Sequence, residues 1–155
     1  METKQTTFSA VIIIVDTNIL FSALISPNGK ISRLMSFPPN PVQYITCHYA
    51  FAELFKHQEK IVRLSKKSID DVVDDLSTLI NRLQLYNEAL IEQQHWQEAD
   101  RLTVDVDSFD ISYVALTLQI GGWLWTGDKK LTKHLKAMKF DCVLNTDEFY
   151  EKLTA

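Results

Sequence analysis

Four acidic residues stand at positions where their carboxylates can gather into one chemical site. They are Asp16, Glu53, Asp110 and Asp128. Carboxylates that lie close together repel each other unless a cation compensates their charge, and hard cations such as Mg²⁺ and Mn²⁺ prefer oxygen ligands. If these side chains meet, we therefore expect one or two Mg²⁺ or Mn²⁺ ions among them. Such ions activate a water and stabilise the leaving oxygen in a hydrolysis.

The first of these acids follows the most distinctive stretch of the chain. Val11 to Val15 is an unbroken run of β-branched residues, which is typical of a strand buried on both faces of a parallel sheet. Ligands of such sheets bind beyond the carboxyl ends of the strands, where Asp16 stands. A second interpretation is that Asp16 only caps the helix that follows. Taken alone, the residue fits both interpretations.

Strand patterns and helix patterns alternate along the whole chain. We predict strands over residues 11–15, 42–46, 83–86, 123–126 and 140–144. We predict helices over 17–25, 31–36, 48–64, 89–102, 108–120 and 131–138, another from an N-cap at Ser65 to about Leu83, and a last one from Thr146. This order favours one α/β domain over residues 1–155, with a central parallel sheet of four or five strands in a three-layer α/β/α arrangement.

The predicted elements bring the acids to one edge of that sheet. Asp16 and Asp128 directly follow strands, whereas Glu53 and Asp110 lie in the early turns of helices. Because parallel strands all point the same way, their carboxyl ends meet at a single edge. Each acid alone could be a helix cap or a partner of a helix dipole. Their joint placement favours a shared site.

The composition indicates an ordinary globular protein. Apolar residues make up 46% of the chain and charged residues 23%, and the formal net charge of −4 argues against a protein that coats nucleic acid. Cys47 and Cys142 fit no zinc-binding spacing. The start of the sequence lacks the apolar core of a signal peptide, and Val11 to Val15 is too short to span a membrane. We therefore expect a cytoplasmic protein with no membrane association.

Two longer stretches carry a resemblance to a known family. The segment VIIIVDTNILFSAL begins at Val11, and the segment DVDSFDISYVALTLQIGGWLWTGDKKL begins at Asp105. Together with the helix that carries Glu53, they are similar to the PIN domain family over nearly the whole chain. The resemblance implies the strand order 3-2-1-4-5 and the cleavage of single-stranded RNA with Mg²⁺ or Mn²⁺. It also implies a VapC-type toxin with an antitoxin protein as partner.

The resemblance assigns roles to individual residues. The four acids match the acidic quartet of the family, Asn18 matches the polar residue beside the first acid, and Thr126 matches the hydroxyl before the last. Asp107 is an alternative to Asp110, although the spacing of Asp110 from Asp128 agrees better with the family pattern. Glu59 is likewise an alternative to Glu53 on the same predicted helix.

Assembly and substrate binding depend on weaker signals. The resemblance implies a homodimer, for which the predicted helices 17–25 and 31–35 offer apolar surface. Lysines cluster just after Asp128, and they form either a solvated helix face or a contact for RNA phosphates. The candidates for RNA binding are Lys129, Lys130 and Lys133. Four acids between Asp70 and Asp75 are interpreted as a solvated helix face.

Two other functions compete with a nuclease. A phosphotransferase of the haloacid dehalogenase type also begins with a strand that ends in an aspartate, but it requires a second aspartate where this chain has Asn18. A catalytically idle PIN-like module that only binds RNA or protein is the other alternative. A complete set of acids argues against the idle module.

Overall fold

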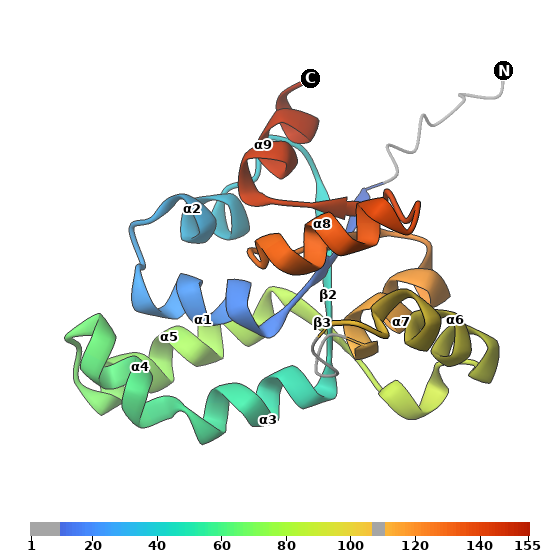
Figure 1. Cartoon of the computed structure of the whole chain (residues 1–155). Coiled ribbons are helices and arrows are strands. Elements are labelled where there is room, and N and C mark those ends of the chain that lie inside the picture. The colour runs from blue at the N-terminus through green and yellow to red at the C-terminus, as the bar shows by residue number, and fades with distance from the viewer. Residues whose placement is uncertain (1–9, 107–110) are drawn as a thin grey trace, which may run out of the picture.

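A computed structural model describes residues 10–106 and 111–155 of the chain. Within this part, five parallel strands form one sheet in the order β3-β2-β1-β4-β5, as expected (Figure 1). The strands are β1 (Val11–Val15), β2 (Val42–Cys47), β3 (Leu83–Tyr86), β4 (Trp123–Trp125) and β5 (Val143–Leu144). β1 is the central strand, and its last three residues are completely buried. The run of β-branched residues therefore forms the core of the sheet.

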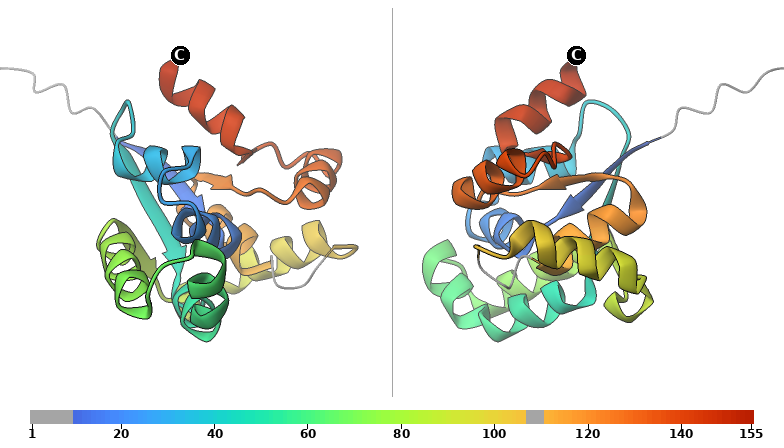
Figure 2. Two further views of the ribbon diagram at one scale, coloured as in Figure 1. Left: turned by 90° about the vertical axis from the view of Figure 1, so that its left-hand side faces the viewer. Right: turned by 45° about the vertical axis from the view of Figure 1, so that its right-hand side comes forward.

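Helices cover both faces of the sheet and give the three-layer α/β/α arrangement (Figure 2). They are α1 (Thr17–Ile25), α2 (Lys30–Ser36), α3 (His48–Lys56), α4 (Gln58–Ser65), α5 (Ile69–Asn81), α6 (Gln93–Thr103), α7 (Ile111–Ile120), α8 (Lys129–Ala137) and α9 (Thr146–Thr154). Tyr44 of β2 donates a hydrogen bond from its hydroxyl to Leu34 O of α2, which marks the face that α1 and α2 cover. α9 packs on the same face, since Phe149 stacks on Trp125 of β4 with 4.7 Å between ring centroids. α7 contacts β1, β2 and β4, and α6 packs against α7.

The long helix predicted over residues 48–64 is wrong, because the structure divides it into α3 and α4. The break lies at His57, whose backbone angles of φ −102° and ψ 20° are not helical. The chain turns there, so that α3 and α4 each pack against α1. A straight helix could not keep both contacts. Apolar spacing alone does not reveal such a turn, since both pieces carry their apolar residues at helical intervals.

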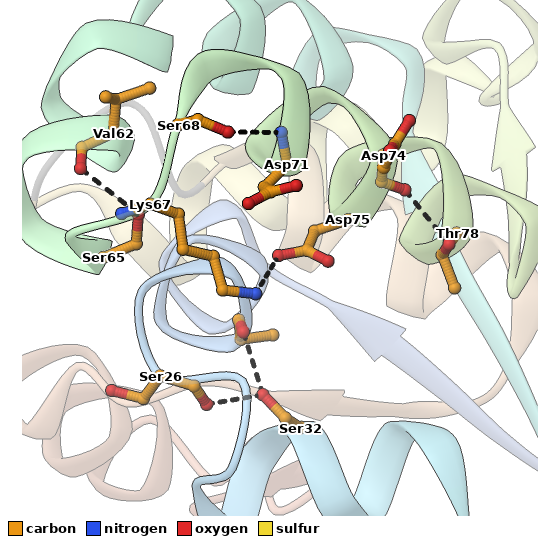
Figure 3. Close-up of polar contacts among 11 residues, drawn as sticks. Ser26, Ser32, Val62, Ser65, Lys67, Ser68, Asp71, Asp74, Asp75 and Thr78 are labelled. Atoms are coloured by element: carbon orange, nitrogen blue, oxygen red, sulfur yellow. Dashed lines mark hydrogen bonds and ion pairs between the residues drawn. The ribbon is translucent and has the colours of Figure 1, made fainter.

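The predicted start of the next helix is also wrong. Ser68, not Ser65, caps α5, and its hydroxyl accepts the Asp71 amide at 3.1 Å (Figure 3). Ser65 instead ends α4, and Lys66 follows it in the left-handed conformation at φ 59°. Two apolar side chains of α5, Ile69 and Val73, are about half exposed. α5 buries Val72, Leu76 and Leu79.

The acids of α5 form a solvated and locally satisfied face. Asp70, Asp71 and Asp74 are exposed, and the first two lie in the first turn of the helix, where negative charge complements the helix dipole. Asp75 is half-buried and pairs with Lys67 at 2.6 Å (Figure 3). The exposed positions of Asp70, Asp71 and Asp74 agree with the predicted solvated helix face.

Smaller differences concern the ends of elements. The predicted helix over 89–102 is a 3₁₀ turn, Glu88–Leu90, followed by α6. The described part of the helix predicted over 108–120 begins at Ile111, and residues 108–110 lie outside the described residues. β5 is shorter than predicted and comprises only Val143 and Leu144. Among the described residues, no helix combines the length and apolar character needed to cross a membrane.

The surface expected to support a homodimer is largely used inside the molecule. The apolar side chains of α1 and α2 that we assigned to an interface include Ile19, Leu20, Leu24, Leu34 and Met35, and all five are buried within the chain. The most exposed large apolar side chain of the described residues is Phe37, which is 84% exposed and follows directly after α2. The homodimer stays a prediction, but this argument from α1 and α2 does not support it.

Close packing of β1 explains one glycine of the Gly121-Gly122 turn. A Cβ atom built on Gly122 would lie 2.8 Å from both Cγ2 and the carbonyl oxygen of Ile12. We therefore expect Gly122→Ala to push β4 away from β1 at a cost of about 1–3 kcal/mol, which lowers Tm by several degrees. Gly127→Ala is the matched control, because its Cβ would meet only Ile19 Cδ1 at 4.0 Å. Equal melting temperatures for the parent and Gly122→Ala would contradict this account.

Candidate active site

The register of the sheet places Asp16 beside Thr126. Val15 of β1 pairs with Trp125 of β4, and the amide of Asp16 donates to Trp125 O at 3.4 Å. Asp16 and Thr126 are therefore the first residues beyond the ends of two neighbouring strands. Asp128 follows two positions later, and its amide donates to the Thr126 hydroxyl at 3.1 Å. Two of the predicted acids thus lie at one edge of the sheet, around the buried Thr126.

The two oxygens of Asp16 have different environments. Oδ1 accepts the amide of Ile19 at 2.9 Å and so caps α1. Oδ2 is buried and has no hydrogen-bond partner among residues 10–106 and 111–155. Buried polar atoms without a partner are rare and costly in proteins. The capping interpretation is therefore right for one oxygen, and the other remains available for a ligand.

Burial in a nonpolar interior changes the pKa of the Asp16 carboxyl. The side chain is only 2% exposed, and burial raises the pKa of its carboxyl from the usual 3.8 to about 6. The nearby Thr126 hydroxyl and the amides of Ile19 and Asn18 oppose the increase, whereas the charge of Asp128 adds to it. The repulsion shows that the two carboxylates lie close enough to influence each other.

Asp128 also caps a helix and belongs to the candidate site. Its Oδ1 accepts the amide of Leu131 at 3.1 Å and caps α8. The side chain is half-buried, so it borders the solvent where Asp16 does not. A ligand that approaches the edge of the sheet would therefore meet Asp128 first and Asp16 at the bottom of the site.

Glu53 reaches the same region from the other neighbour of β1. It lies on α3, which directly follows β2, and it is half-buried. Burial raises the pKa of the Tyr113 hydroxyl well above its usual value, and the charges of Asp16 and Glu53 raise it further. Tyr113 thus lies within electrostatic range of both acids. Glu59 is exposed on α4, beyond the break at His57, which favours Glu53 over Glu59 as the site residue.

Tyr113 and Glu88 are the two residues near the site that sequence reasoning missed. The buried Tyr113 of α7 forms a hydrogen bond with the hydroxyl of Thr17, the residue after Asp16. Glu88 follows β3 and accepts the amide of Tyr49 at 2.7 Å. It thereby caps the first turn of α3, for which Cys47 provides no side-chain cap. Both residues tie a helix of the site to a neighbouring element, and only the three-dimensional arrangement reveals them.

Two predicted residues lie outside the described part of the chain. They are Asp107 and Asp110, in the segment 107–110. Within residues 10–106 and 111–155, no three His, Cys, Asp or Glu side chains lie close enough together to hold a metal ion. α7 begins at Ile111 and contacts β1, β2 and β4, so its start adjoins this segment. The choice between Asp107 and Asp110 stays a prediction.

The described residues nevertheless fit a divalent cation. Mg²⁺ is usually held by one or two carboxylates together with waters, and Asp16 and Asp128 are two such carboxylates. The free Oδ2 of Asp16 is a hard oxygen donor that lacks a partner among the described residues. A cation there would compensate both its desolvation and its repulsion with Asp128.

The remaining predicted residues surround this centre. Asn18 is exposed in the first turn of α1, and Thr126 is fully buried. Lys129, Lys130 and Lys133 are exposed on α8, which begins directly after Asp128.

Comparison with known proteins agrees with this arrangement. A family model described as PIN domain matches residues 14–145. VapBC2 from Rickettsia felis, solved bound to a DNA fragment from its promoter, superposes with a TM-score of 0.67 at 14% identity, covering 87% of this chain and 98% of that chain. PAE2754 from Pyrobaculum aerophilum gives a TM-score of 0.62 at 16% identity over 99% of both chains. VapBC-1 from nontypeable Haemophilus influenzae gives 0.63 at 15% identity, over 88% of this chain and 99% of that chain. No curated protein matches the sequence.

The buried Asp16 predicts a pH dependence of stability in the absence of metal. Its folded-state pKa of about 6 lies above the usual 3.8, so its contribution to stability is fully present below about pH 4 and is lost as the pH rises through 6. A difference of this size corresponds to roughly 3 kcal/mol. In the presence of a chelator, we expect Asp16→Asn to reduce the fall in the free energy of unfolding between pH 4.5 and 7.

Denaturant unfolding at the two pH values measures this difference. The control is Asp74→Asn, an exposed aspartate of α5, which should leave the pH dependence of the parent unchanged. An Asp16→Asn protein with the same pH dependence as the parent would show that Asp16 is not the group that titrates.

Proposed function

This chain belongs to the PIN domain family, and we propose that it is a metal-dependent endoribonuclease that hydrolyses phosphodiester bonds of single-stranded RNA. PIN domains are generally nucleases. The observation that carries the proposal is the free, buried Oδ2 of Asp16 beside Asp128, at the carboxyl edge of the sheet. A buried carboxylate oxygen without a partner is costly, and a bound cation would compensate that cost.

The acids of the site would hold the cation. Asp16 and Asp128 are the ligands that the geometry supports, Asp110 or Asp107 would come from the segment before α7, and Glu53 would act from α3. A bound Mg²⁺ or Mn²⁺ would supply Lewis-acid chemistry that activates a water and neutralises charge on the departing 3′ oxygen, so that the products would carry a 5′-phosphate and a 3′-hydroxyl.

The protein contributes by fixing its carboxylates before the substrate arrives. The bond from Ile19 holds Oδ1 of Asp16 and so determines where Oδ2 lies. The bond from Leu131 does the same for Asp128, while the Thr126 hydroxyl holds the backbone of Asp128. Ligands that are fixed in advance need little reorganisation when charge develops in the transition state. Asn18 and Thr126 thus support the site, and no side chain acts as a covalent nucleophile.

The biological setting is proposed from the similar structures. The VapBC structures share this fold, and VapC-type PIN domains act as toxins that an antitoxin protein restrains. We infer that this chain is such a toxin, that it binds a cognate antitoxin and that it acts on RNA in the cytoplasm as a homodimer. Sequencing of the adjacent genes tests the toxin role, because a small gene for a DNA-binding protein should stand beside this one.

One prediction from the proposed function concerns RNA cleavage. We expect Asp16→Asn and Asp110→Asn to reduce Mn²⁺-dependent cleavage of a single-stranded RNA by at least about a hundredfold, because each change removes a ligand charge but keeps the shape. Asp107→Asn should have a smaller effect. The measurement is gel analysis of a labelled RNA with Mn²⁺ and with a chelator, and Asp74→Asn is the control for a lost surface charge.

The outcomes separate the competing functions. Cleavage by Asp16→Asn at the parent rate would contradict the site assignment, and a complete loss in Asp107→Asn would move the third ligand to Asp107. Hydrolysis of a phosphomonoester without RNA cleavage would favour a phosphotransferase. An inactive parent with either metal would favour a module that only binds.

Another prediction from the proposed function links metal binding to stability. A ligand that binds only the native state at a hundred times its Kd adds about 2.7 kcal/mol, and 1 kcal/mol changes Tm by roughly 2–4 °C in a domain of this size. Saturating Mn²⁺ should therefore raise Tm by several degrees. Asp128→Asn should raise the metal-free Tm, because repulsion with Asp16 disappears while asparagine still caps α8, and it should reduce the Mn²⁺ increment.

Thermal melts with chelator and with Mn²⁺ test this for both proteins. Equal Mn²⁺ increments in the parent and in Asp128→Asn, or no increment in the parent, would contradict a metal site that includes Asp128.

A further inference from the structure

A groove runs from the candidate site along α8 to the start of α9. Its volume is about 430 Å³, and it is lined by Thr126, Gly127, Lys129, Thr132, Lys133, Lys136 and Asn145. One end is formed by the two residues that precede Asp128, and the other lies at the N-cap of α9. The groove is therefore an extension of the site, open to solvent and directed away from the buried Asp16.

Three lysines line this groove because of their spacing on α8. Lys129, Lys133 and Lys136 are separated by four and three residues, so they share one face of the helix. Lys130 is exposed on the same helix but does not line the groove. The structure thus divides the lysines that the sequence grouped together: Lys129 and Lys133 belong to the groove, Lys136 joins them, and Lys130 does not.

The chemistry of the groove is that of an anion-binding surface. Within the described residues, Lys129 and Lys133 form no ion pair, and Lys136 pairs with Glu148 at 3.1 Å. Asn145 uses its side-chain oxygen to accept the Glu148 amide, which leaves its amide nitrogen as a donor. No carboxylate is among the described lining residues. Such a basic groove is notable in a chain with a net charge of −4.

The groove is also long enough to bind a polyanion along its length. From Lys129 to Lys136 the helix rises by roughly 10 Å at about 1.5 Å per residue, so the lysines are spread along a line and do not converge on one point. A single phosphate would need converging donors. A chain of phosphates needs a row of cations that follows its backbone.

We propose that this groove binds the phosphodiester backbone of the RNA strand next to the bond that is cleaved. The inference rests on the proposed nuclease function, because that function identifies the end of the groove at which the strand is cleaved. Binding of RNA in the groove does not itself require cleavage. The strand passes Gly127 and continues along Lys129, Lys133 and Lys136 towards Asn145. The acidic site then acts on the phosphate that lies over Asp16 and Asp128.

The test is RNA binding by the full-length protein in the presence of a chelator. Fluorescence anisotropy with a labelled single-stranded 12-nucleotide RNA gives the Kd over a range of salt concentrations. We expect Lys133→Ala and Lys129→Ala to weaken binding at least about threefold and to reduce the salt dependence by about 0.7 per lost phosphate contact. Lys130→Ala is the matched control and should leave both quantities unchanged.

Further variants keep the test independent of folding and of catalysis. Alanine is a good helix former, so Tm should not fall in these variants, and Lys133→Arg should restore binding. Asp16→Asn should still bind the RNA. If the parent binds RNA through the groove but never cleaves it, the groove inference stands and the proposed nuclease function fails.

Three results would overturn the inference. Equal weakening by Lys130→Ala and Lys133→Ala would show that general surface charge, not the groove, attracts RNA. No change in any lysine variant would show that RNA binds elsewhere. Tighter binding of an acidic peptide such as a glutamate oligomer, with the same dependence on Lys133, would assign the groove to a protein partner.

Discussion

The structure depends on a single buried carboxylate at the end of its central strand. Asp16 is 2% exposed, and the backbone of its neighbours satisfies only one of its two oxygens. A carboxylate in this position destabilises the folded protein unless it is protonated or paired with a cation. The fold tolerates that cost because β1, whose last three residues are completely buried, is packed between β2 and β4. The central strand of the sheet therefore leads directly into a carboxylate with one oxygen that has no partner among the described residues.

The other features of the site follow from this constraint. Because β1 is central, each of its two neighbouring strands can bring side chains beside Asp16. β4 supplies Thr126 and Asp128, whose cap of α8 fixes its orientation. β2 leads into α3 and Glu53, and Glu88 holds the start of that helix from the far side of β2. The carboxylates of Asp16 and Asp128 are each held by a bond that also caps a helix, so stability and function use the same contacts.

The sequence pattern was sufficient to predict those elements whose bounds are determined by residues close together in the sequence. β1, α1 and β3 have the predicted bounds, because a β-branched run, a cap and a short alternating strand are each complete within a few residues. The break at His57 escaped prediction because packing of α3 and α4 against α1 imposes it, not the propensity of any residue near it. The position of Asp16 and Asp128 at one sheet edge was predictable from strand order. Tyr113 and Glu88 were not, because their partners lie on distant segments that only the fold brings together.

The acidic site and the lysines of α8 lie on different parts of the surface, and this arrangement affects how the site could bind a polyanion. The carboxylates of the site would repel RNA phosphates, and the net charge of −4 gives the protein no general attraction for nucleic acid. If the chain binds RNA as we propose, the attraction would come from local features: a cation at Asp16 and Asp128, and the row formed by Lys129, Lys133 and Lys136. α8 connects the two, since its N-cap is an acid of the site and its side carries the lysines. In the proposed complex, one helix would therefore set the distance between the reacting phosphate and the phosphates that the lysines contact.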